Sequence, residues 1–118
     1  MVSQRKTRED KVLVVEDNPA ICHELEERFN CDCASDGWDA IGKLETQQYA
    51  AILIDADVPH SSGYGVLTYL REEVGEDLPN VIFMTSDEPD TIRRRVGTTL
   101  NVISKSNAVG EVTRVLIR

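Results

Sequence analysis

Apolar residues in this chain form short continuous runs, separated by longer stretches in which they recur every three or four positions. Short continuous runs are typical of strands that are buried on both faces of a parallel sheet. Such runs occur at residues 11–15, 50–54, 80–84 and 101–103. The segment 31–34 (CDCA) alternates polar and apolar residues, so it suits a strand at the edge of the sheet.

Helical spacing of the apolar residues predicts a helix after each strand. Pro89 suits the first turn of the fourth helix, with Asp87 as its N-cap, because that turn leaves backbone N–H groups unpaired. We expect Trp38 to pack the second helix against the core. The stripes expected to face the core are Ile21, Leu25 and Phe29; Ala40, Ile41 and Leu44; Val66, Leu67, Leu70 and Val74; Ile92 and Val96; and Ala108, Val109, Val112, Val115 and Leu116.

The regular alternation of strand and helix predicts an α/β fold. We expect a flavodoxin-like, doubly wound sheet of five parallel strands in the order 2-1-3-4-5, with five helices. The prediction divides the chain into a polar N-terminal tail at residues 1–10 and one domain at 11–118. Ligands of such sheets bind beyond the carboxyl ends of the strands, where the first and third strands lie side by side.

Composition limits the possible partners. The 118 residues are 41% hydrophobic and 29% charged, which fits one globular domain. A net charge of −8 argues against direct binding of nucleic acid or of an anionic membrane surface. No stretch resembles a signal peptide or a membrane span, and three cysteines without a secretory signal suggest free thiols, so a cytoplasmic location is expected.

Polar residues follow the central strands at the points where these strands end. Glu16 and Asp17 come after the first strand and Asp55 ends the third, so three carboxylates are expected at one edge of the sheet. Carboxylates brought so close repel one another, and a hard divalent cation, with Mg²⁺ the first candidate, relieves that repulsion. Thr85 after the fourth strand and Lys105 after the fifth add a hydroxyl and a positive charge, which suits a phosphoryl group.

Together these features resemble the receiver domain of two-component response regulators. The resemblance extends from Lys11 to Ile117. It rests on the acidic pair after the first strand, on LIDADVP with Gly63 eight residues past Asp55, on MTS after the fourth strand and on SK after the fifth. No single one of these motifs is specific, but their combined spacing is.

The resemblance implies a role for each residue at this edge. Asp55 is expected to accept a phosphoryl group, Thr85 to contact the phosphoryl oxygens and Lys105 to pair with the acyl phosphate. The side chain of Asp57 is expected to be a solvated loop group. The Mg²⁺ ligands implied are three carboxylates and one backbone carbonyl, from Glu16, Asp17, Asp55 and Asp57, in that order.

The resemblance also implies partners. The phosphoryl donor is expected to be a sensor histidine kinase or a phosphotransfer protein, and the output a downstream effector protein or a fused effector domain. The domain is then a regulatory device rather than an enzyme, although it catalyses its own phosphorylation and dephosphorylation. The switching surface is expected around the fourth helix, the fifth strand and the fifth helix.

Two departures from the family pattern keep an alternative open. Val102 stands where family members usually have an aromatic residue, and Ser106 stands where they usually have proline after the lysine. They support a degenerate receiver that acts as a phosphorylation-independent interaction module. A remote alternative is a haloacid dehalogenase-like phosphatase, because DADV resembles the D-x-D-x-V motif of those enzymes; there, however, the motif lies on the first strand of a longer chain.

Overall fold

The computed structural model describes residues 11–57, 62–75, 78, 80–97 and 100–117. The predicted N-terminal tail therefore lies outside the described residues. The strands are β1 (Val12–Val15), β2 (Cys31–Ala34), β3 (Ala51–Asp55), β4 (Val81–Thr85) and β5 (Asn101–Ser104). The helices are α1 (Pro19–Arg28), α2 (Gly37–Thr46), α3 (Ser62–Glu73), α4 (Pro89–Val96) and α5 (Ala108–Ile117), with a short 3₁₀ helix η4 (Lys105–Asn107) before α5.

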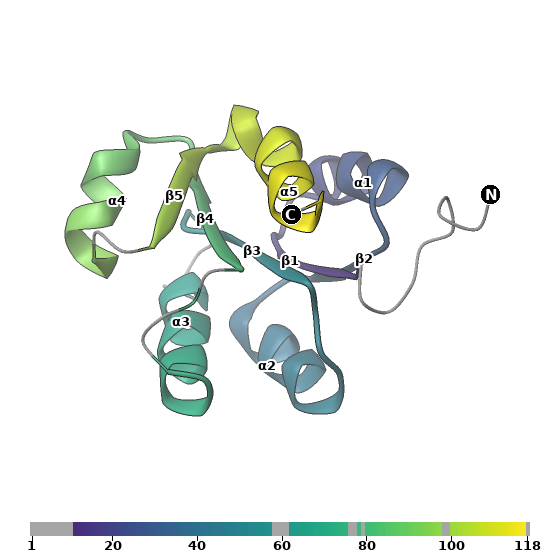
Figure 1. The fold of residues 1–118 in the computed structure, drawn as a ribbon, viewed down its shortest axis with the longest axis horizontal. Coiled ribbons are helices and arrows are strands. Elements are labelled where there is room, and N and C mark those ends of the chain that lie inside the picture. Colours follow the sequence, from purple (N-terminus) through teal and green to yellow (C-terminus); the bar gives the residue numbers. More distant parts are fainter. Residues whose placement is uncertain (1–10, 58–61, 76–77, 79, 98–99, 118) are drawn as a thin grey trace.

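All five strands form one parallel sheet in the order β2-β1-β3-β4-β5, which confirms the predicted fold. Helices α1 and α5 cover one face, and α2, α3 and α4 cover the other (Figure 1). Each face of the sheet has its own apolar core, and successive residues of a strand point into opposite cores. Val12 and Val14 of β1 pack on the α1–α5 side, whereas Leu13 and Val15 pack on the opposite side. Burial on both faces explains the unbroken apolar runs.

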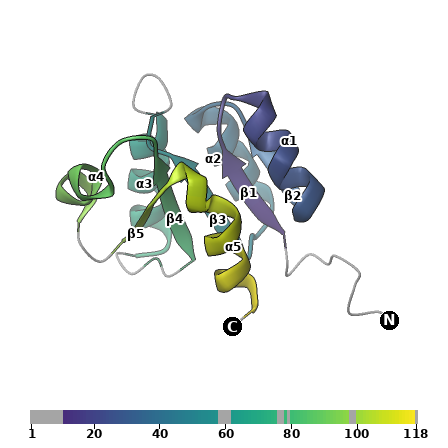
Figure 2. The same ribbon diagram turned by 90° about the horizontal axis from the view of Figure 1, so that it is seen from above.

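The carboxyl ends of the central strands meet at one edge of the sheet. The connections that leave β1, β4 and β5 toward their helices lie at the same edge in Figure 2. The register places Val15 beside Ile54, Asp55 beside Met84, and Thr85 beside Ser104. The residues that end or follow these strands are therefore brought together although they are far apart in the sequence.

The helix starts show where local sequence decides the structure. Asn18 caps α1, with its side-chain oxygen 3.0 Å from the Ala20 nitrogen, and Asp36 caps α2 through the Asp39 nitrogen at 2.9 Å. The prediction that Asp87 caps α4 is wrong. Glu88 occupies that position without a side-chain hydrogen bond, because Pro89 directly follows it and begins the helix.

Two apolar residues predicted to face the core lie at the surface instead. Trp38 is 85% exposed, because the buried side of α2 is set by Gly37 and Ala40, and a residue next to Gly37 points away from it. Val74 is 67% exposed, because α3 ends at Glu73, one residue before it. No helix in the described part of the chain has the length and apolarity that crossing a bilayer requires.

The β3 strand supports the site edge, so its interior should be sensitive to truncation. Replacing the fully buried Leu53 with alanine is expected to lower the free energy of unfolding by about 2–5 kcal/mol, because the cavity left behind cannot fully collapse. Replacing the exposed Val74 with alanine should change it by less than about 0.5 kcal/mol. Urea denaturation of both variants measures the difference, and equal effects would contradict the assigned core.

Candidate functional site

Three carboxylates meet at the edge of the sheet where the central strands end. Glu16 and Asp17 directly follow β1, and Asp55 is the last residue of β3. Each offers an oxygen, and these oxygens all lie within 4.8 Å of one another. Glu16 and Asp55 are each only 2% exposed, whereas Asp17 is exposed to solvent. Such a group of hard oxygen atoms has the chemistry of a site for Mg²⁺.

Glu16 carries the clearest sign that this group is made for a cation. One carboxylate oxygen accepts a hydrogen bond from the Asn18 backbone nitrogen at 3.0 Å. The other oxygen, Oε1, is buried and has no hydrogen-bond partner among the described residues. Burial, reinforced by Asp55, raises the pKa of Glu16 to about 7. A divalent cation would give this oxygen the close partner that it lacks and favour the charged form, so the residues present fit a metal ion.

Lys105 supplies the positive charge of the site. Its Nζ lies 3.0 Å from Asp55 Oδ2 and 3.7 Å from Glu16 Oε1. Burial disfavours its charge, but the Asp55 carboxylate outweighs that effect and raises the pKa of Lys105. Lys105 thus reaches Asp55 although Ser106 stands where the family usually has proline.

Thr85 and Asp57 form the remaining part of the site. Thr85, fully buried at the end of β4, donates from Oγ1 to Asp57 Oδ1 at 3.1 Å. Asp57 Oδ2 accepts from both the backbone nitrogen and the hydroxyl of Ser86, each at 2.8 Å. The backbone nitrogen of Asp57 donates to Asp55 Oδ1 at 2.8 Å. These contacts tie the loop after β3 to the end of β4.

The expectation that the Asp57 side chain is merely solvated is therefore wrong. Burial disfavours its ionisation, but the hydrogen bonds from Ser86 and Thr85 outweigh this and lower the pKa of Asp57. Sequence reasoning also missed Ser86 as a partner in the site. A usable signal was present, because both residues follow neighbouring strands by one or two positions and so reach the same edge.

Val102 lies in the core rather than at the surface. It is 1% exposed and belongs to the apolar cluster that also contains Phe83 and Ile92. The ring of Tyr64 packs against Phe83 in the same region, with their centroids 5.9 Å apart. The position that is usually aromatic in the family is thus a small side chain sealed beneath α4.

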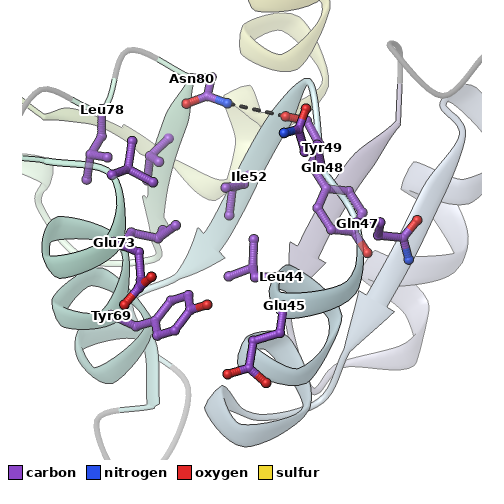
Figure 3. Close-up of a pocket in the computed structure, with 13 residues that line it drawn as sticks. Leu44, Glu45, Gln47, Gln48, Tyr49, Ile52, Tyr69, Glu73, Leu78 and Asn80 are labelled. Atoms are coloured by element: carbon purple, nitrogen blue, oxygen red, sulfur yellow. Dashed lines mark hydrogen bonds between the residues drawn. The ribbon is translucent and has the colours of Figure 1, made fainter.

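The surface has a hollow at each end of the sheet, and the two hollows differ in the residues that line them. A shallow hollow of about 520 Å³ is lined by the exposed Asp17 and the buried Glu16. A groove of about 620 Å³ between α2 and α3 lies at the other end, where Ile52 and Asn80 mark the starts of β3 and β4 (Figure 3). There the Asn80 amide donates to the Tyr49 carbonyl at 3.4 Å, as Figure 3 shows, and this bond joins the start of β4 to the segment before β3.

Comparison with known proteins agrees with this geometry. Residues 12–116 match the model of a family described as the response regulator receiver domain. The chain belongs to this family. The family assignment and the strand order predicted from sequence are thereby confirmed. The phosphatase alternative loses its support, because the receiver match covers nearly all of the chain and DADV lies at the end of β3.

The curated relatives are transcriptional regulatory proteins that are longer than this chain. The chain is 33% identical over 81 residues to the transcriptional regulatory protein TctD of Salmonella typhimurium, covering 64% of this chain and 35% of that protein. It is 31% identical over 91 residues to the transcriptional regulatory protein PcoR of Escherichia coli, covering 73% of this chain and 38% of that protein. The chain thus spans little more than a third of these curated relatives.

A solved structure shows a similar domain with a metal ion. The receiver domain of the sensor histidine kinase PA1611 from Pseudomonas aeruginosa is 28% identical, with a TM-score of 0.72. The match covers 91% of this chain and 93% of that one. That structure has a magnesium ion coordinated in its active-site cleft.

The crowding of carboxylates in this receiver domain should cost folding energy when no divalent cation is present. Replacing Glu16 with glutamine is expected to raise the free energy of unfolding in EDTA at pH 8 by about 1–3 kcal/mol, since it removes a poorly compensated buried charge. The measurement is urea denaturation. Glu24→Gln, the same substitution at an exposed position of α1, is the control and should leave stability nearly unchanged. A variant less stable than wild type would contradict the account.

Proposed function

We propose that this receiver domain takes a phosphoryl group from a histidine kinase onto Asp55, in a reaction that requires Mg²⁺, and thereby switches a protein-interaction surface. The observation that carries the proposal is the environment of Asp55. Its carboxylate sits at the edge of the sheet, 3.0 Å from Lys105, within reach of two further carboxylates and beside the hydroxyl-bearing loop after β4.

Asp55 has the properties of the nucleophile. An aspartate needs no general base, because its ionised oxygen already carries the electron pair that attacks phosphorus. In the proposed step the bond between phosphorus and the donor's imidazole nitrogen breaks, and a bond forms between phosphorus and an Asp55 oxygen. The electron pair of the broken bond stays with the imidazole. The hydrogen bond from the Asp57 backbone nitrogen orients the Asp55 carboxylate for this attack.

The acidic residues are the proposed metal ligands. Glu16, Asp17 and Asp55, together with the backbone carbonyl of Asp57, would hold Mg²⁺. When bound, the ion supplies positive charge that offsets the negative oxygens of the transferred group. The unpaired buried oxygen of Glu16 and the magnesium found in the related receiver domain of PA1611 both support this assignment.

Lys105 and Thr85 are the proposed contacts of the phosphoryl group. Lys105 already pairs with Asp55 and is the first residue of η4, so it needs only a small movement to meet a phosphoryl oxygen. The Thr85 hydroxyl is a hydrogen-bond donor at the same edge. When the Asp55 carboxylate becomes an acyl phosphate, Lys105 exchanges a carboxylate oxygen for a phosphoryl oxygen as its partner. This change of charge at Asp55 is the signal that the site can transmit.

The output surface and partners follow from the family and from charge. We propose that the switch acts on α4, β5 and α5, which adjoin Thr85 and Lys105 along the chain. The partners proposed are a sensor histidine kinase or phosphotransfer protein upstream, and an effector protein or fused effector domain downstream. The latter fits the transcriptional regulatory relatives, which are longer. The domain itself, proposed as residues 11–118 after a polar tail, is expected to be cytoplasmic and to bind neither membrane nor nucleic acid.

One observation favours a second candidate, the phosphorylation-independent interaction module. Val102 is buried in the core and has no ring, so this position lacks the aromatic side chain that family members usually have there. The intact group around Asp55 argues for the first candidate. Direct phosphorylation separates the two.

Incubation with acetyl phosphate and Mg²⁺ should add one phosphoryl group to the wild type. The Asp55→Asn variant should gain none, because an amide is not a nucleophile toward phosphorus. Intact-mass spectrometry measures the gain, and Asp90→Asn on the surface of α4 is the control that should behave as wild type. If a cognate kinase also fails to label the wild type, the interaction module is the better description.

The requirement for Mg²⁺ should depend on the exposed carboxylate of the acidic pair. Asp17→Asn is expected to raise the Mg²⁺ concentration for half-maximal phosphorylation by about tenfold or more, since it removes one charged ligand. Titration of the labelling rate with Mg²⁺ measures this, with Asp90→Asn again as control. Labelling that persists in EDTA would argue against a metal in the reaction.

A further inference from the structure

We propose that the Asp57 carboxylate competes with the phosphoryl group for the same hydrogen-bond donors. In the unphosphorylated domain the Asp57 carboxylate occupies these donors, and it must leave them when Asp55 is phosphorylated. This inference rests on the proposed function. It assigns to Asp57 a role in setting how readily the site accepts the phosphoryl group, in addition to its backbone contribution to the metal site.

The contacts of Asp57 resemble those of a bound anion. Its Oδ1 accepts from the Thr85 hydroxyl at 3.1 Å, and its Oδ2 accepts from the Ser86 backbone nitrogen and hydroxyl at 2.8 Å each. Lys105 Nζ lies 3.8 Å from the same Oδ2. Two hydroxyls, one backbone N–H and one ammonium group thus converge on a single carboxylate.

The same donors cannot serve two anions at once. The Thr85 hydroxyl has a single hydrogen, and it donates that hydrogen to Asp57. Its oxygen accepts from the Asp87 backbone nitrogen at 2.9 Å. The Ser86 backbone N–H likewise has one hydrogen, which points at Asp57. A phosphoryl oxygen that takes either hydrogen must therefore displace a carboxylate oxygen.

Asp57 lies next to Asp55, so its carboxylate and a phosphoryl group on Asp55 would compete in the same space. The Asp57 backbone nitrogen donates to Asp55 Oδ1 at 2.8 Å, so the two residues are held beside each other at the rim. Lys105 contacts both of their carboxylates. A phosphoryl group on Asp55 would carry about −1.5 to −2 charge into this space, next to the charge of Asp57. Repulsion then adds to the competition for donors.

The Asp57 side chain also lies close enough to solvent to move out of the site. Its side chain is 27% exposed, whereas Asp55 is 2% exposed, so Asp57 can turn toward solvent without leaving a buried charge behind. A group that must displace an internal ligand binds with lower apparent affinity than it would in an open site. Asp57 therefore favours the unphosphorylated state and keeps Thr85 and Ser86 tied to the β3 loop until the phosphoryl group replaces it.

The test compares noncovalent binding of beryllium fluoride, a tetrahedral substitute for the phosphoryl group, in the presence of Mg²⁺. The variants are Asp57→Ala, which removes the competitor, and Asp57→Asn, which keeps the shape and one acceptor oxygen but not the charge. The control is Glu88→Gln, which removes one negative charge at the start of α4, where the side chain makes no capping hydrogen bond. Circular dichroism verifies that each variant folds.

We expect Asp57→Ala to bind beryllium fluoride about tenfold more tightly than wild type, because charge-assisted hydrogen bonds no longer hold the donors. Asp57→Asn should fall between the two, and Glu88→Gln should match wild type. Without the anion, the Ser86 amide resonance should shift and its hydrogen should exchange faster in Asp57→Ala. That readout reports the contact itself and does not depend on phosphorylation.

The outcomes separate this inference from the proposed function. Unchanged binding in Asp57→Ala overturns the inference, and so does weaker binding, which would mean that Asp57 prepares the donors for the phosphoryl group. Equal tightening in Glu88→Gln also overturns it, since net charge would then explain the effect. If wild type and all variants fail to bind the anion, the proposed function itself fails, and the inference falls with it.

Discussion

The ion pair between Lys105 and Asp55 is the interaction on which the site depends. Three carboxylates share one edge of the sheet, and two of them are almost fully buried. Only an opposite charge makes such an arrangement tolerable, and Lys105 lies 3.0 Å from Asp55 and 3.7 Å from Glu16. Glu16 Oε1 still lacks a hydrogen bond among the described residues, so the compensation is incomplete. A site left partly unsatisfied in this way has the donor chemistry of a cation site.

The parallel sheet creates this arrangement because it delivers the ends of all central strands to one place. Glu16, Asp55, Thr85 and Lys105 each end or follow a different strand, and the strand order makes those strands neighbours. The buried strands beneath hold the positions of these residues, because each strand is packed on both faces.

Periodicity predicted the architecture because burial on both faces leaves a signal that no surface element imitates. It placed all five strands within about one residue, and the strand order followed from the alternation. It failed where one turn decides the outcome, as at Trp38, which lies next to the buried side of α2, and at Val74, just past the end of α3. The Asp57 contact with Ser86 joins residues 29 positions apart, so no local pattern contained it, and only the neighbouring ends of β3 and β4 indicated it.

The central claim is that Asp55, and no other carboxylate of the group, accepts the phosphoryl group. The most direct measurement is borohydride reduction of the phosphorylated domain, which converts an acyl-phosphorylated aspartate to homoserine, followed by peptide sequencing by mass spectrometry. The account predicts homoserine at position 55, with Asp17 and Asp57 unchanged. Homoserine at either of those positions, or reduction of Glu16 instead, would contradict it.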